Sequence, residues 1–487
     1  MEEKNLNNQV SEEDKKKERQ LEIIYPTIYL GNGLYSSYFA NFFSMVMTDV
    51  YTFPVVLAGI IQIAASFVKW IYGPAFGALI DGFKFKNGKF WPWIRIGIVS
   101  MSIAQVLVFA LPAFGVDPTN PLIIALVFFL QLCVSFSQPL YSTSINAVYP
   151  RISKDPQARN LLAVAQNIAR EAGKSIFGAI VPVVLVAFTN KLGDAKAYAV
   201  LAVICVLITY LPHFLFSCAL KDSYIEREAA QEAEKTKKQA TSVLAILKAV
   251  FANKAVLGVT FAMIFYKAFS FMLSMSVTYV FKYYFVNFAA FGIYQTTFNL
   301  ACIGGVCVGV FWRKLWKDTK KAFLAGSILQ LAMLVVLCFI FKNLTTLTFT
   351  VYIGIMEFFA GLYDAYFVPM FAAGADYGEY TTGKRADGLT MAIYTMGVTF
   401  GSSVNTAIRT AVLDKAGYDA KALTADPSSA SEALKAGLAS LVTWIPAILC
   451  AAMIVCILVL YPLSDKKHAE IVEVVKERRA AAEAEGK

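Results

Sequence analysis

Seven charged side chains lie inside long apolar stretches of this chain. They are four cations and three carboxylates: Lys69, Arg170, Lys174, Lys267, Glu171, Glu357 and Asp364. A charge inside a bilayer costs from about 2.5 kcal/mol upward, so residues of this kind usually serve a function. They can join helices as ion pairs, bind a charged solute, or carry a proton. For Lys69, Glu171, Glu357 and Asp364 we expect a role in coupling to an ion.

The spacing of these residues groups them by helix face. Arg170 and Lys174 are four residues apart with Glu171 beside them, which fits either a structural ion-pair cluster or a gate. Glu357 and Asp364 are seven residues apart and therefore share one face. We expect those two carboxylates, together with Lys69, to be the candidates for carrying a proton.

Apolar stretches that recur along the whole chain must position these groups. The sequence is 57% hydrophobic and 16% charged, and a stretch of about 20 apolar residues can span a bilayer. Backbone groups have no water partner in lipid, so the spans must be helices. We predict an all-α membrane protein with twelve transmembrane helices: 25–47, 54–80, 93–114, 121–149, 161–190, 196–219, 254–283, 286–311, 321–341, 345–374, 386–411 and 436–462.

The basic residues predict the topology. The net charge is +10, and most Lys and Arg fall in the tails and in loops on one side of the predicted membrane. This is the positive-inside pattern, so we expect both termini in the cytoplasm, a multi-pass protein of the inner or plasma membrane, and no nucleic-acid partner. The eight cysteines lie in apolar segments without metal-ligand spacing, which predicts packing and no metal.

A charged central segment divides the chain into two six-helix halves. We predict a cytoplasmic tail 1–24, a bundle 25–219, a central loop 220–253, a second bundle 254–462 and a tail 463–487. The central loop and the last tail are helical in pattern. This is the layout of major facilitator transporters, whose halves rock about a midplane site.

The stretch 77–93, GALIDGFKFKNGKFWPW, has the features of a hinge between two spanning helices. Small residues let helices approach closely, and tryptophans sit at the level of the lipid headgroups. A carboxylate near a helix end can hold the loop's cations or its free amides, and we expect Asp81 to do so.

Two segments resemble the glycoside–pentoside–hexuronide:cation symporters, the group of the melibiose permease. They are 48–97, which contains the hinge, and 375–397, ADYGEYTTGKRADGLTMAIYTMG. The resemblance implies a major facilitator fold that moves a glycoside-like solute, usually with Na⁺ or H⁺. The family's two cation-binding acids of the second helix correspond to Lys69 and Gly73, an acidic position of the fourth helix to Ser137, and a cavity lysine to Phe400. The Na⁺ site therefore does not carry over.

Lys69 suggests a replacement for the lost cation. Its ammonium would stand where Na⁺ binds in the family, which favours coupling to H⁺ or to no ion over coupling to Na⁺. We expect no other cofactor. Aromatic rings and amides can form a sugar-binding surface, and the cation excess leans toward an anionic solute such as a uronide. The expected substrate-binding residues are Tyr35, Tyr38, Lys69, Trp70, Tyr72, Gln138, Tyr141, Arg170, Lys267, Tyr363, Tyr394 and Asn405.

Gating residues are expected in the cytoplasmic loops, where pairs between the halves would close the inside. They are Asp81, Lys89 and Arg151 in the first half, and Asp376, Glu379 and Arg385 in the second.

Two other functions stay open at this stage. Eukaryotic relatives of the family move lipids, so a lysolipid carrier is an alternative, and a transporter-like solute sensor is another. No P-loop or hydrolytic constellation is present, so we expect no enzyme. We expect a monomer whose partners are a small sugar-like solute and the lipid bilayer.

Overall fold

The computed structural model describes residues 12–82, 85, 88–152, 156–221, 223–235, 253–382 and 387–484. These residues are almost entirely helical, and the one β contact among them is an isolated bridge between Phe85 and Gly88. The chain divides into two compact units, Met1–Ala240 and Thr241–Lys487, called here the N-terminal unit and the C-terminal unit. Each unit has its own buried core.

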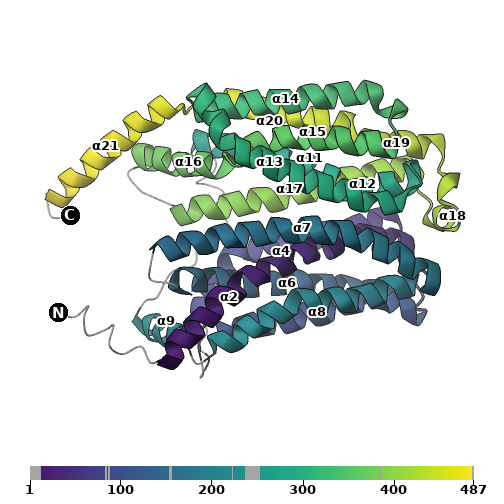
Figure 1. The fold of residues 1–487 in the computed structure, drawn as a ribbon, viewed down its shortest axis with the longest axis horizontal. Helices are drawn as coiled ribbons and strands as arrows, with labels where there is room; N and C mark the ends of the chain where they lie inside the picture. The colour runs from purple at the N-terminus through teal and green to yellow at the C-terminus, as the bar shows by residue number, and fades with distance from the viewer. Residues whose placement is uncertain are drawn as a thin grey trace. The chain divides into compact units, whose positions relative to one another are not determined.

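The N-terminal unit contains long helices joined by short turns (Figure 1). The chain is helical from Glu12 to Val50, and this segment includes two π-helical turns. In order, the helices of the unit are α2 (Glu12–Tyr35), a π turn (Ser36–Ala40), α3 (Asn41–Met45), a second π turn (Val46–Val50), α4 (Val55–Gly82), α5 (Trp91–Ala110), a 3₁₀ turn (Leu111–Phe114), α6 (Pro121–Ile152), α7 (Pro156–Leu192), α8 (Asp194–Leu220) and α9 (Tyr224–Lys235).

Small residues bring α2 into close contact with two neighbours. A Cβ added to Gly33 would lie 2.4 Å from the backbone of Gly173 on α7, and one added to Gly31 would lie 2.7 Å from the carbonyl of Thr209 on α8. Any larger side chain would push these helices apart. In membrane helices, where lipid competes equally for apolar surface, such close packing is a main source of association.

The C-terminal unit also consists of long helices joined by short turns. Its helices are α11 (Lys254–Phe271), a π turn (Met272–Ser276), α12 (Val277–Tyr279), a π turn (Val280–Tyr284), a 3₁₀ turn (Phe288–Ala290), α13 (Phe291–Trp316), α14 (Thr319–Ile340), a 3₁₀ turn (Phe341–Asn343), α15 (Thr346–Asp364), α16 (Phe367–Thr382), α17 (Asp387–Lys415), α18 (Ala420–Ala425), a 3₁₀ turn (Pro427–Ser429), α19 (Glu432–Val442), α20 (Trp444–Leu460) and α21 (Asp465–Ala484). Helix α21 ends at the C-terminus in Figure 1.

The tightest helix pair of the C-terminal unit is α13 with α15. A Cβ on Gly305 would lie 2.1 Å from the carbonyl oxygen of Phe358, and one on Gly361 would lie 2.2 Å from the carbonyl oxygen of Cys302. The two backbones therefore touch without intervening side chains, and glycine is required on both sides of the contact.

Nine helical stretches in the described residues are long and apolar enough to cross a membrane. They correspond to nine of the twelve predicted spans. The other three predicted spans are also helical, but the region of α4 provides only a shorter apolar stretch, Val55–Lys69. The chain is thus an all-helical protein with many membrane-spanning helices, and the count of twelve stays a prediction.

Two predicted spans are interrupted. The span 345–374 is divided into α15 and α16 because Pro369 has no N–H and its ring blocks the carbonyl of Ala365, four residues earlier. The span 436–462 breaks at Thr443, where φ is −122° and ψ is −93°. The last tail, helical in pattern, forms α21, and α9 forms part of the central segment.

Candidate functional site

Lys69 and Gln138 form the polar centre of the N-terminal unit. The ammonium of Lys69 on α4 donates to Oε1 of Gln138 on α6 at 2.5 Å, and both side chains are half-buried. No carboxylate within the described residues pairs with this ammonium. An amide oxygen removes only part of the cost of placing a positive charge among helices, so the site keeps an unneutralised charge available to a solute.

The remaining predicted binding residues of this unit divide into two kinds. Tyr38 is completely buried and donates its hydroxyl to the carbonyl of Tyr198 at 2.7 Å, so it packs the π turn Ser36–Ala40 against α8. Tyr141 is 4% exposed, and its ring meets the edge of His213 at 5.2 Å. Tyr35 is half-buried and therefore more exposed than Tyr38 and Tyr141.

The charged residues of α7 interact locally. Lys174 pairs with Glu171 at 2.8 Å, and each side chain is about one third exposed. Arg170 donates to Oδ1 of Asn167 and lies 5.7 Å from the ring of Tyr29. The Glu171–Lys174 pair lies within one helix, and the structural and gating interpretations of this cluster both stay predictions.

Lys267 and Asp364 form the central ion pair of the C-terminal unit. The ammonium lies 3.3 Å from Oδ1 of Asp364, and the two side chains are 18% and 32% exposed. The ammonium also lies 4.5 Å from the centre of the Tyr266 ring. Residues 97 positions apart thus join α11 to the C-terminal end of α15.

Glu357 lies deeper than Asp364. Its side chain is 2% exposed, and its Oε1 has no hydrogen-bond partner among the described residues. Nearby on the same helix, the fully buried Tyr363 donates to Oε1 of Gln330 on α14, and Nε2 of Gln330 is likewise without a partner there. Buried polar atoms are nearly always bonded, so Oε1 of Glu357 and Nε2 of Gln330 are exceptions among the described residues.

Tyr394 and Asn405 of α17 differ in burial. Tyr394 is half-buried, with its ring edge against Phe371 at 5.5 Å. Asn405 is 1% exposed and accepts a hydrogen bond from the hydroxyl of Ser276 at 2.9 Å. Arg409, one turn further along α17, is 3% exposed and was not among the predicted charges at depth. It lies inside the predicted span 386–411, and that position is the signal that would have identified it.

Three of the predicted gating residues, Lys89, Arg151 and Asp376, contact side chains of their own units. The Lys89 ammonium lies 5.2 Å from the ring of Phe90, and the Arg151 guanidinium lies 5.9 Å from that ring. Asp376 accepts from Nε2 of His468 on α21 at 2.9 Å. Glu379 is 9% exposed.

Some predicted site residues cannot be placed. The side chains of Trp70, Tyr72 and Asp81, and the whole of Arg385, lie outside the described part of the chain.

Glu226 on α9 holds the start of α5, a role that the sequence suggested for Asp81. Its carboxylate accepts the backbone N–H groups of Lys89 at 2.5 Å, Phe90 at 2.9 Å and Trp91 at 2.5 Å. Glu226 is 2% exposed, and burial raises its pKa above the ordinary value although the three amide bonds act in the opposite direction. We call this arrangement the Glu226 clamp. It satisfies free amides at the beginning of a helix, where a negative charge is favoured.

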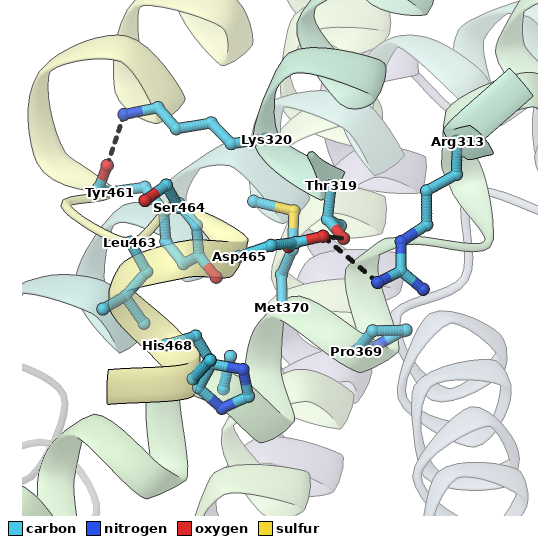
Figure 2. Close-up of a pocket in the computed structure, with 12 residues that line it drawn as sticks. Arg313, Thr319, Lys320, Pro369, Met370, Tyr461, Leu463, Ser464, Asp465 and His468 are labelled. Carbon is cyan, nitrogen blue, oxygen red and sulfur yellow. Dashed lines mark hydrogen bonds and ion pairs between the residues drawn. The ribbon is translucent and has the colours of Figure 1, made fainter. Parts of the chain in front are cut away.

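A cavity of about 250 Å³ lies in the C-terminal unit where α21 meets α14 and α16 (Figure 2). The carboxylate of Asp465 accepts from Arg313 at 3.1 Å and from the hydroxyl of Thr319 at 3.2 Å, while Lys320 donates to the carbonyl of Tyr461 at 2.6 Å. These bonds hold the pKa of the Asp465 carboxyl below its ordinary value against the opposing effect of burial. The charges of this cavity are therefore used to anchor α21.

No group of three or more His, Cys, Asp or Glu side chains within the described ranges could hold a metal ion. The two polar centres described above offer amines, amides, hydroxyls and carboxylates, a set suited to binding a polar solute and moving a proton.

Comparison with known proteins identifies the family. The sequence profile described as "MFS/sugar transport protein" matches residues 24–465. The chain is 26% identical to a lactose permease of Lactobacillus helveticus, with 96% of this chain and 73% of that protein covered. It is 24% identical to an isoprimeverose transporter of Lactiplantibacillus pentosus (80% and 78% covered) and 25% identical to a putative sulfoquinovose importer of Escherichia coli (89% and 88% covered).

Solved structures agree on the fold. A bacterial homologue of the iron transporter ferroportin matches with a TM-score of 0.65 at 8% identity, covering 92% of this chain and 99% of that one. A bacterial homologue of the lysosomal transporter Spinster matches with a TM-score of 0.61 at 11% identity, covering 92% and 98%. With the profile match extending over nearly the whole chain, the protein belongs to the MFS/sugar transport protein family and is a multi-pass membrane transporter rather than an enzyme.

Proposed function

We propose that this protein carries a sugar or glycoside, with acidic uronides as the favoured class, across the cell membrane by alternating access. The curated relatives include transporters named for lactose, isoprimeverose and raffinose, which supports a glycoside-like solute. In transporters of this architecture the halves rock about a midplane site, with both termini expected on the cytoplasmic side.

The observation that carries the proposal is the contact between Lys69 and Gln138. By the sequence resemblance, Lys69 corresponds to an acid that holds the coupling cation in the symporters, and the hydrogen-bond partner of its ammonium is an uncharged amide. A tethered charge at this position replaces a bound Na⁺ and attracts a carboxylate of the solute. Hydroxyl groups of a sugar are suited to the amide of Gln138 and the phenol of Tyr35.

Coupling to H⁺ is supported by the C-terminal unit. Glu357 is buried with an unpartnered oxygen, and Asp364 is paired with Lys267 in a partly exposed position. A carboxylate without a partner gains from being protonated when water is excluded. We assign Glu357 as the first proton carrier and Asp364 as the second, and we place Na⁺ coupling behind H⁺ coupling and uncoupled transport.

Uptake into proteoliposomes tests this function directly. Labelled glycosides and uronides are supplied with a Na⁺ gradient, a pH gradient or no gradient, each imposed separately. We expect accumulation with an inward proton gradient and no stimulation by Na⁺. Stimulation by Na⁺ alone would contradict the role of Lys69.

Lys69→Ala and Lys69→Arg separate charge from shape at this position. We expect Lys69→Ala to lose uronide uptake and Lys69→Arg to retain part of it, because the second variant keeps the positive charge. Lys191→Ala removes an exposed lysine at the end of α7 and is the matched control. Equal uptake by all three variants, with unchanged ion dependence, would refute the assignment.

Glu357→Gln tests proton coupling independently of solute binding. It should abolish accumulation driven by a pH gradient while leaving solute counterflow, which needs no net proton movement. If the variant still accumulates solute at the wild-type level, Glu357 does not carry the proton.

A further inference from the structure

We propose that the surface formed by α5 and α8 binds the phosphate headgroup of an anionic phospholipid at the end where α5 begins and α8 ends. This inference concerns the outer surface of the N-terminal unit and is independent of the solute. The basic residues at that end assign it to the cytoplasmic leaflet by the positive-inside rule.

Two cations lie near one aromatic ring at this end of the α5–α8 surface. The guanidinium of Arg95 on α5 lies 5.0 Å from the Trp91 ring and 5.0 Å from the Phe214 ring on α8. The ammonium of Lys221, directly after α8, lies 5.5 Å from the same Trp91 ring. Both positive charges therefore lie close to the Trp91 ring, which attracts a cation but does not neutralise its charge.

Neither cation has a carboxylate partner among the described residues. Arg95 donates from Nη2 to the sulfur of Cys218 at 3.1 Å, a weak acceptor, and its buried Nε has no hydrogen-bond partner there. The side chain of Lys221 is exposed. Paired cations elsewhere in the chain differ in this respect, since Arg313 pairs with Asp465 at 3.1 Å. Arg95 and Lys221 are therefore free to bind a phosphate.

Apolar stripes lead away from these cations along both helices. The exposed side chains recur at three- and four-residue spacing, so each stripe follows one helix face. The stripe on α8 covers about 21 Å from Ile204 to Cys218 at 1.5 Å per residue, enough for the acyl chains of one leaflet. The exposed apolar residues are Ile96, Val99, Ile103 and Leu107 on α5, and Ile204, Leu207, Ile208, Leu211, Phe214 and Leu215 on α8.

The Glu226 clamp preorganises the headgroup site. It holds the backbone N–H of Trp91 at 2.5 Å and thereby sets the position of the ring on which both cations lie. A site whose groups are fixed before binding loses less entropy when a ligand arrives. The combination of a fixed ring, two cations without a carboxylate partner among the described residues, and exposed apolar stripes matches a diacyl lipid with one phosphate diester.

Lipid titration followed by native mass spectrometry tests the proposal. The purified full-length protein in detergent is titrated with dioleoyl phosphatidylglycerol and, separately, with dioleoyl phosphatidylcholine, which has the same acyl chains but no net charge. We expect tighter binding of phosphatidylglycerol. Arg95→Gln and Lys221→Gln should each weaken it about fivefold, and the double variant about 25-fold, since each cation near an anionic headgroup contributes a similar amount.

The control and the opposing results are well defined. The double variant Lys191→Gln, Lys342→Gln removes two exposed lysines from other parts of the chain and should leave the affinity unchanged. An equal loss in both double variants, or equal binding of the two lipids, overturns the site. Displacement of the lipid by millimolar inorganic phosphate overturns the lipid assignment in favour of a soluble anion. Lys221→Gln alone, at an exposed position, must show its fivefold loss if the Arg95 variants do not fold.

Discussion

Removing the Glu226 carboxylate should open the start of α5 locally. The carboxylate accepts three consecutive amides, those of Lys89, Phe90 and Trp91. Phe90 is 3% exposed, so water cannot replace its lost acceptor, whereas residues 89 and 91 are half-buried. A buried orphan amide costs about 1–3 kcal/mol and a lost helix cap about 0.5–2 kcal/mol.

The net cost of Glu226→Ala follows from these terms. The variant also relieves the burial of one carboxylate, which offsets part of the loss. We expect a net destabilisation of the clamp of about 2–3 kcal/mol, equivalent to roughly 30- to 150-fold faster hydrogen exchange at the Phe90 amide. Hydrogen–deuterium exchange of the peptide that contains residues 89–91 measures this increase in the exchange rate.

Glu228→Ala is the matched control. Glu228 belongs to the same helix and has the same charge, but its side chain is exposed. Exchange at residues 89–91 should be unchanged in this variant. If Glu226→Ala and Glu228→Ala exchange at equal rates, the clamp contributes nothing to the stability of this region.

The same clamp has a defined pH dependence. Burial raises the pKa of Glu226 above its value in an open, solvated state. In the closed state Glu226 binds the amides of residues 89–91. A carboxyl group whose pKa is raised in the closed state stabilises that state fully at a pH below the pKa of the open state. This contribution is lost as the pH rises through the raised pKa of the closed state. Protection at residues 89–91, corrected for intrinsic exchange, should therefore increase as the pH falls toward 4.5. Glu226→Gln, which cannot ionise, should remove this trend.

Two further predictions concern the C-terminal unit. Gly305→Ala should lower the melting temperature by several degrees, because its Cβ would lie 2.1 Å from the carbonyl of Phe358, whereas Gly304→Ala, with its nearest atom at 3.6 Å, should cost little. Equal melting temperatures would exclude the close contact of α13 with α15. Lys267→Met should be more destabilising alone than together with Asp364→Asn, because the single variant leaves a partly buried carboxylate without its partner; additive losses in a thermal double-mutant cycle would refute the pairing.

The hinge stretch illustrates what local sequence can and cannot specify. Its basic residues, its glycine and the tryptophans that begin α5 indicate a loop whose amides need an acceptor. The expected acceptor was Asp81, whose side chain lies outside the described residues, and the structure adds Glu226, 135 to 137 residues away from the amides that it binds. The central segment contains several glutamates close together, and the sequence does not indicate which of them accepts the amides. The choice depends on which face of α9 packs inward, as shown by Ile225 and Ala229, both completely buried.

The sequence by itself determined the membrane character, the helical fold, the transporter class and most of the charged positions at depth, because the cost of placing polar groups in lipid restricts what each stretch can be. Only the tertiary structure decided which of those charges meet. Lys267 reaches Asp364 across 97 residues, Lys69 meets an amide, and Oε1 of Glu357 has no hydrogen-bond partner in the described part of the chain. Pairing depends on the rotation and offset of packed helices, and these follow from contacts such as Gly305 with Gly361, which periodicity along one helix does not encode.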